Sequence, residues 1–180
     1  HSHMLAEEGF YRAGGLAAVT PVFSPMLMLH EHAGLSSKLE RMEGLAAPLL
    51  DEYKPQPGEM MFIFSNSGVN HLPVEMALVA RKLGLTVVSV SSHAYARLSP
   101  LSSLGQRLDE AADIALDNGS PPGDALVLIP GQVWKVGPGS TILAALIWNC
   151  LVCECAFQLQ SINAPVPVFV SLNTPEAGSS

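Results

Sequence analysis

A short polar loop at residues 65–70, SNSGVN, has the residue types needed to hold an anion. An apolar run precedes it at residues 60–65, and a helical pattern follows from about residue 72 to residue 83. The first N–H groups and the positive dipole end of a helix attract an anion, and a glycine lets the backbone approach a ligand closely. Serine and asparagine can hydrogen-bond phosphate oxygens, although both also serve as ordinary helix N-caps. The candidate anion ligands are Ser65, Asn66, Ser67, Gly68 and Asn70.

Other motifs for cofactors or metals are weak. The loop lacks the Gly-Lys-Ser/Thr of a P-loop and the G-x-G-x-x-G of a dinucleotide site. The sequence HEH at residues 30–32 is the only dense cluster of histidine and glutamate, and it lacks a clear third metal ligand. The three cysteines lie within six residues of an apolar helical run, which favours core packing in a reducing compartment. We therefore expect neither a cofactor nor a metal ion.

The elements that must position the loop can be read from the hydrophobic periodicity, which alternates between strand-like and helix-like. Strands are expected at residues 17–23, 60–65, 85–90, 114–116, 125–129 and 166–172, and helices at residues 4–13, 37–53, 72–83, 99–112 and 140–162. This alternation needs crossover connections, which give an α/β fold: a three-layer α-β-α sandwich with a mainly parallel, doubly wound sheet. Such sheets bind ligands beyond the carboxyl ends of their strands. We expect one domain over residues 1–172 and a flexible tail at 173–180.

Composition limits the partners. The 180 residues are 48% hydrophobic and 14% charged, which excludes disorder and leaves a lean polar surface for a monomer, so some apolar surface is expected to be buried against another subunit. The formal net charge of −7 argues against a nucleic-acid partner. The most apolar stretch, residues 142–157, falls short of the roughly 20 residues that span a bilayer, so no membrane partner is expected. A signal peptide is not apparent, which fits a cytoplasmic location.

The loop and several other segments resemble a known family. SNSGVN is similar to the S-x-S-G-x-T/N signature of the sugar isomerase (SIS) domain family. The segments at residues 6–15, 38–44, 115–125 and 136–141 resemble a little-studied bacterial family of SIS-domain, phosphosugar-binding proteins. The opening HSHM is similar to the end of a G-x-G-H-S-H-M loop in that family, and it is also close to a common cloning scar. The family reading implies that the first strand lies upstream of this sequence and that Ser2 is a phosphate ligand.

The resemblance implies a SIS-like, flavodoxin-type topology, a sugar phosphate as ligand and an aldose/ketose isomerase as activity. Isomerisation needs a base that moves a proton and an acid that helps the sugar ring to open. Glu43 is the candidate base, because a Glu-Gly pair stands at a similar place in SIS-domain etherases acting on N-acetylmuramic acid phosphate. His30 is the candidate for ring opening. Both could instead be solvated surface residues, and Ser140 could contact the sugar or simply cap the long helix.

Two further functions stay open. SIS domains also serve as non-catalytic phosphosugar sensors in transcription regulators, although this chain shows no helix-turn-helix and no basic patch. A lyase that cleaves a lactyl ether from an amino sugar phosphate is the third possibility, to which only the Glu-Gly pair points. The family also implies a homodimer or homotetramer with sites at subunit interfaces, and no nucleotide or metal.

Overall fold

The structure is a computed structural model that describes residues 2–174. Its helices are α1 (Ser2–Gly9), the short 3-10 helix η1 (Pro25–Leu27), α2 (Leu29–Leu39), α3 (Ala46–Asp51), α4 (His71–Lys82), α5 (His93–Leu98), α6 (Leu108–Ala111) and α7 (Ser140–Ser161). Its strands are β1 (Met60–Phe64), β2 (Thr86–Ser91), β3 (Ile114–Asp117), β4 (Ala125–Leu128) and β5 (Lys135–Pro138).

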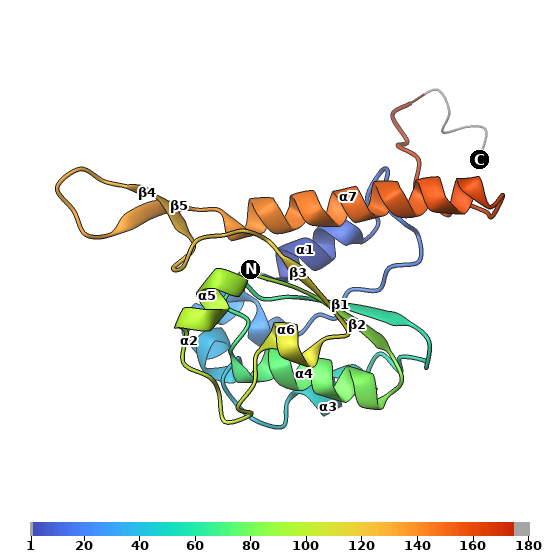
Figure 1. Cartoon of the computed structure of the whole chain (residues 1–180). Coiled ribbons are helices and arrows are strands. Elements are labelled where there is room, and N and C mark those ends of the chain that lie inside the picture. The colour runs from blue at the N-terminus through green and yellow to red at the C-terminus, as the bar shows by residue number, and fades with distance from the viewer. Residues whose placement is uncertain (1, 175–180) are drawn as a thin grey trace.

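A parallel sheet of strand order β1-β2-β3 forms the central layer. β1 pairs with β2 from Met60↔Thr86 to Phe64↔Val90, and β2 pairs with β3 from Val88↔Ile114 to Ser91↔Asp117. Helices α3, α4 and α6 lie on one side of the sheet, whereas α1 and α7 lie on the other (Figure 1). The expected α/β fold with helices on both faces of a parallel sheet is confirmed, and the carboxyl ends of its strands meet at one edge.

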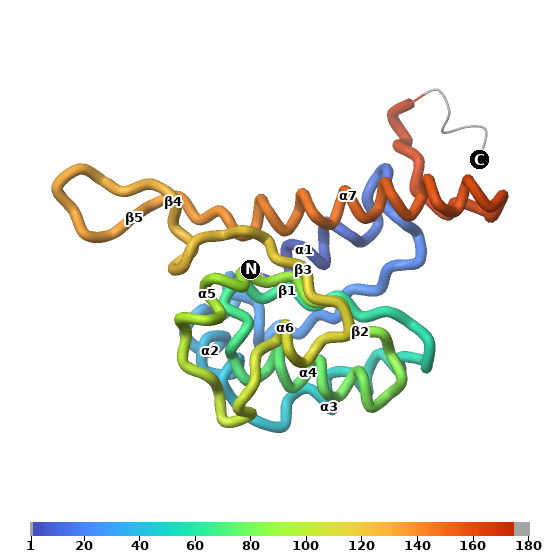
Figure 2. The backbone as a smooth tube through the Cα atoms, viewed as in Figure 1, coloured from blue at the N-terminus to red at the C-terminus, as the bar shows by residue number. Residues whose placement is uncertain are grey.

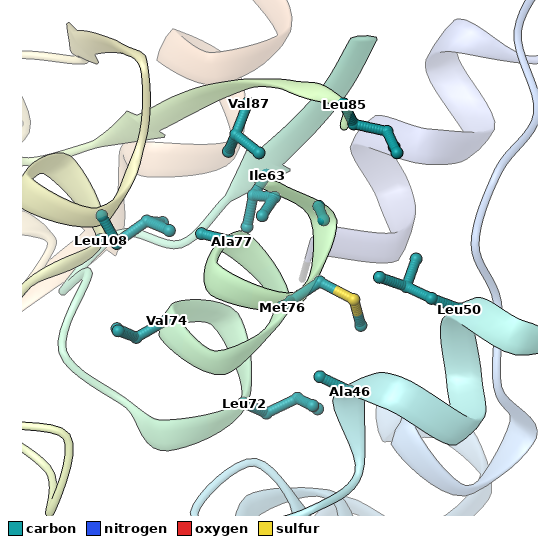
Figure 3. Close-up of a cluster of buried hydrophobic side chains, with 12 residues drawn as sticks. Ala46, Leu50, Ile63, Leu72, Val74, Met76, Ala77, Leu85, Val87 and Leu108 are labelled. Atoms are coloured by element: carbon teal, nitrogen blue, oxygen red, sulfur yellow. The ribbon is translucent and has the colours of Figure 1, made fainter. Parts of the chain in front are cut away.

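Alternation along β1 builds a core on each face of the sheet. Ile63 points toward α4 and packs with Val87 and Val74, which are fully buried (Figure 3). Phe62 lies on the opposite face, where its ring meets the indole of Trp148 in α7 edge to face at 5.1 Å between centroids. Aromatic pairs prefer this arrangement. The middle of β1 therefore packs against the helices on both faces of the sheet.

Two of the expected strands, residues 17–23 and 166–172, are not strands. A single antiparallel bridge joins Leu16, the residue just before the first segment, to Val168 in the second. Proline carries no N–H to donate to a ladder, and these segments contain Pro21 and Pro167. The hydroxyl of Tyr53 instead accepts from the N–H of Phe23 at 2.7 Å and donates to its carbonyl at 2.8 Å. A side chain distant in sequence therefore takes the place of a neighbouring strand.

Two of the expected helices are also broken. The span 37–53 divides, because α2 ends at Leu39 and α3 begins at Ala46, with Gly44 at φ +81° between them. The span 99–112 is mostly loop, and helix appears before it in α5 and at its end in α6. Residues 32–34, which lie outside every expected helix and strand, fall within α2, which has a kink at His32. Of the expected tail, residues 175–180 lie outside the described residues.

Strands β4 and β5 form an antiparallel hairpin apart from the main sheet. We call residues 125–138 the arm, because they project away from the body before the chain enters α7 (Figures 1 and 2). The arm exposes large apolar side chains, including Leu126, Val127 and Trp134. A two-stranded hairpin is marginally stable alone in water, and this one also leaves apolar surface exposed.

The long helix α7 is apolar on all sides but packs along only one of them. Its 22 residues have a mean hydropathy of 1.8 over the most apolar window, of which 17% is buried. The buried side chains are Ala144, Trp148 and Val152, four residues apart. The helix is long and apolar enough to cross a bilayer by length and composition, which corrects the expectation that this stretch falls short.

Candidate functional site

An open cleft of about 760 Å³ lies beyond the carboxyl ends of β1 and β2. Its walls come from α1, the loop at residues 65–70, the loop at residues 99–103, and the start of α7. Parallel sheets leave this edge open, because each crossover helix begins here and turns away from the strands. The loop predicted to bind an anion therefore lies in the wall of this cleft.

The first turn of α4 has no side-chain cap. Asn70 occupies the N-cap position, but its Nδ2 donates to Glu40 Oε1 at 2.8 Å and its side chain accepts nothing from the helix. Leu72 N–H donates to the carbonyl of Glu40 at 3.0 Å, and Pro73 has no N–H. Within residues 2–174, no hydrogen bond is made by the backbone N–H groups of residues 67–70. The loop thus presents free donors at the positive end of a helix, as an anion site requires.

The loop is held rigidly against the ends of β2 and β3. Asn66 accepts from Asn118 Nδ2 at 3.0 Å with its side chain and from Ser92 N–H at 2.9 Å with its carbonyl. Gly68 has φ +61°, and a Cβ there would lie 3.3 Å from Ser91 Cβ. The carbonyl of Gly68 accepts from Leu108 N–H at 2.7 Å. Glycine is needed here for the turn and for close packing on β2.

The predicted ligands divide between the cleft wall and its support. The wall includes Ser2 and Ser140, together with the side chains of the loop other than Gly68. Ser2 Oγ donates to the carbonyl of Phe64 at 2.6 Å, which holds α1 beside the end of β1. Gly68 is buried and supports the loop from behind. The ligand roles of these residues stay predictions.

A carboxylate caps the start of α7. Asp124 Oδ1 accepts from the N–H of Ser140 at 2.8 Å and from that of Gly139 at 3.1 Å. Asp124 Oδ2 accepts from Ser140 Oγ at 2.9 Å, and Ser120 Oγ donates to Oδ1 at 3.2 Å. The hydroxyl proton of Ser140 is therefore used within the protein, so Ser140 can offer a ligand only its remaining acceptor capacity.

The two predicted acid–base residues lie in different settings. His30 is exposed and is absent from the cleft wall in the described chain; its ring lies 5.8 Å from that of His3. Glu43 is also exposed, but its Oε1 accepts from Ser103 Oγ at 2.6 Å, and Ser103 lies in the wall. Only Glu43 is joined to the cleft by a hydrogen bond, and the catalytic roles of both residues stay predictions.

Sequence reasoning missed several residues of the wall. His71 has an exposed fraction of 4% and faces the cleft. Glu40 anchors Asn70 through Oε1, and its Oε2 lies 3.8 Å from Arg41 Nη1. Arg41 is the one Lys or Arg side chain in the wall as described. The sequence signal for Arg41 was its place in the segment at residues 38–44, which resembles the SIS-domain family.

Asp117 supports the edge of the site from the end of β3. Burial raises the pKa of its carboxyl, but hydrogen bonds from the N–H groups of Gly119 and His93 outweigh that effect. The charge of His93 acts in the same direction, so the pKa of Asp117 lies below its ordinary value of 3.8. The ionised carboxylate fixes the turn after β3 and the start of α5.

The chain belongs to the SIS domain family, whose profile matches residues 1–92, a span that includes the loop at 65–70. Phosphosugar binding is the function class that this family defines. A UPF0309 protein of Shouchella clausii is 42% identical over 175 residues, which cover 96% of this chain and 71% of the relative. UPF0309 proteins of Brucella canis and Brucella abortus are each 40% identical over 178 residues, covering 99% of this chain and 72% of theirs.

Proposed function

We propose that this protein is a sugar-phosphate isomerase that interconverts an aldose phosphate and a ketose phosphate. The main support for a phosphate-bearing ligand is the uncapped start of α4, where free N–H groups and short hydroxyl side chains of the preceding loop face an open cleft. A phosphate group matches these donors without needing a lysine or arginine inside the loop. Arg41 lies in the same wall and adds positive charge at the mouth.

The catalytic part of the proposal rests on Glu43. A carboxylate can carry a proton between neighbouring carbon atoms of an open-chain sugar, which is the step that isomerisation needs. Glu43 lies in the segment between α2 and α3, and Ser103 connects it to the cleft at 2.6 Å. Family membership supports phosphosugar binding, and the link from Glu43 to the cleft supports the choice of isomerisation over binding alone.

We also propose that the protein works as a homodimer or homotetramer. The arm and the outer sides of α7 expose large apolar side chains, among them Ile142, Leu146 and Phe157. A second copy could cover this surface by placing the same patch against itself, as two-fold symmetric interfaces do. Sedimentation velocity at several protein concentrations tests this point.

Thermal unfolding tests the ligand, because a compound that binds only the folded state raises the melting temperature by mass action. The panel contains ribose 5-phosphate, glucose 6-phosphate and N-acetylglucosamine 6-phosphate, each paired with its free sugar. We expect a sugar phosphate to raise Tm, the free sugar to have no effect, and Ser67→Ala to weaken the shift. Ser37→Ala, an exposed serine of α2 outside the cleft wall, serves as the matched control.

Product analysis with the same sugar phosphates and with N-acetylmuramic acid 6-phosphate, combined with the unfolding experiment, separates the alternatives. Absence of any phosphate-dependent shift in the wild type would contradict the proposed ligand. A shift without turnover to a ketose phosphate, unchanged in Glu43→Gln, would favour a sensor. Release of lactate from N-acetylmuramic acid 6-phosphate would identify the lyase.

A further inference from the structure

A chain of hydrogen bonds runs from the predicted base into the cleft wall. Ser103 Oγ donates to Glu43 Oε1 at 2.6 Å and lies 3.1 Å from His71 Nδ1. The three side chains come from three separate places: the segment before α3, the start of α4, and the loop at residues 99–107. Ser103 and His71 both line the cleft. The tertiary fold, rather than any local motif, therefore brings them together.

The number of available protons fixes the direction of each hydrogen bond between these side chains. A serine hydroxyl has one proton, and here Ser103 gives it to the carboxylate of Glu43. The proton in the contact between His71 and Ser103 must then come from His71 Nδ1, which makes the serine oxygen its acceptor. The hydroxyl oxygen has a second acceptor site, and Ser103 is exposed in the cleft. That site is free to accept a hydrogen bond from a ligand hydroxyl.

A fourth side chain holds this arrangement in place. Glu75, one turn after His71 in α4, accepts from the N–H of Gly44 at 2.8 Å and from that of Ala46 at 3.1 Å. These bonds fix the backbone on either side of the segment that carries Glu43. Glu75 Oε1 also lies 3.9 Å from His71 Nε2, so the same carboxylate faces the other side of the imidazole. Helix α4 therefore holds both the segment that carries Glu43 and the side chain of His71.

We propose that Ser103 Oγ is the atom that takes the proton of the anomeric hydroxyl when the cleft opens the ring of a bound sugar phosphate. As that proton moves to Ser103 Oγ, the serine proton moves to Glu43. The bond between C1 and the ring oxygen breaks, the C1–O1 bond becomes a carbonyl, and the ring oxygen takes a proton from water in the open cleft. The hydroxide left behind takes the proton held by Glu43, which restores both the water molecule and the carboxylate. His71 Nδ1–H stabilises the negative charge that develops on the serine oxygen. This inference rests on the proposed phosphosugar function.

Ring opening can be measured without isomerisation, because it exchanges the α and β anomers of a sugar phosphate. The probes are ribose 5-phosphate, glucose 6-phosphate and N-acetylglucosamine 6-phosphate, each labelled with ¹³C at C1, and the readout is anomer exchange by two-dimensional NMR. For a probe that raises Tm, we expect the wild type to accelerate exchange and Ser103→Ala to lower that acceleration about 10²-fold, which is typical for loss of acid–base catalysis. Ser103→Thr keeps the hydroxyl and should restore most of the rate.

Two further variants separate chemistry from structure. Glu43→Gln keeps the size of the side chain but cannot take the proton, so its exchange rate should fall while the ligand-induced rise in Tm remains. Ser37→Ala removes an exposed hydroxyl outside the cleft wall and should leave the exchange rate unchanged. Equal loss in Ser37→Ala and Ser103→Ala would overturn the role of Ser103.

The outcomes distinguish this inference from the function on which it rests. If no probe raises Tm, the phosphosugar function fails and the role of Ser103 fails with it. If a probe binds but the wild type does not accelerate anomer exchange, or Ser103→Ala exchanges as fast as the wild type, the role of Ser103 is overturned while phosphosugar binding stands. Loss of exchange in Ser103→Ala with an unchanged Tm shift, and recovery in Ser103→Thr, supports it.

Discussion

Replacement of Gly68 by alanine tests whether the loop depends on close packing against β2. Gly68 has φ +61°, and an added Cβ would meet Ser91 Cβ at 3.3 Å and Ser91 Oγ at 3.4 Å. Gly105 has a similar φ of +67° with nothing within 4 Å of an added Cβ, so Gly105→Ala carries the backbone strain without the contact. The left-handed conformation costs an L-residue about 1–2 kcal/mol, partly offset by the lower entropy of the unfolded chain.

The two variants should therefore differ in a defined way. We expect Gly105→Ala to lose about 1 kcal/mol, and overpacking at Ser91 to raise the loss in Gly68→Ala to about 2–3 kcal/mol. For a chain of this size, that larger loss corresponds to a fall in Tm of about 4–12 °C. Differential scanning calorimetry of both variants gives the comparison. An equal loss in the two variants would refute the packing argument, and an unchanged phosphate-dependent Tm shift in Gly68→Ala would refute its link to the ligand.

Three other predictions concern the supports of the cleft. Asp124→Ala removes four hydrogen bonds around the start of α7 and should lower the free energy of unfolding in urea by about 1–2 kcal/mol. An equally large loss in Asp124→Asn would contradict the role of Asp124 as a hydrogen-bond acceptor. Tyr53→Phe should cost about 1 kcal/mol and speed amide exchange at Phe23, and unchanged protection there would contradict the bridge. The folded-state pKa of Asp117 is lowered, so its contribution to stability is full above pH 3.8 and is lost as the pH falls through the folded-state value. The stability difference between wild type and Asp117→Asn should shrink on acidification in that window, and a constant difference would contradict the assignment.

The parts of the fold with strong local signals could be predicted from the sequence. The apolar run at residues 60–65, the helix after it and the apolar run at residues 85–90 became β1, α4 and β2 with boundaries shifted by at most one residue. Each has a consistent period and a clear stop, such as Gly84 after α4 at φ +84°. Local propensity and tertiary packing agree in this crossover unit, and the loop that it carries could be found for the same reason.

The remaining elements depend on contacts that a local pattern does not contain. Residues 17–23 have the composition of a strand, but the hydroxyl of Tyr53 and the prolines decide their conformation. The loop at residues 99–107 looks helical by composition, yet Pro100 disfavours helix at the preceding residue and Arg107 starts a new cap with Glu110. His71 could not be recognised as buried, because the side chains that cover it come from other parts of the sequence.

Helices α4 and α7 both begin at the cleft, and the local charge around their N-termini differs. Before α4 the N–H groups of the loop at residues 67–70 are open to a ligand, whereas at the start of α7 the N–H groups of Gly139 and Ser140 already donate to the carboxylate of Asp124. An anion is therefore attracted at one end of the cleft and repelled at the other, which gives the hollow an electrical polarity. On the proposed function, this polarity favours one orientation of a ligand with a single charged end, with its phosphate toward the loop before α4 and its uncharged hydroxyls toward Ser140 and the base of the arm.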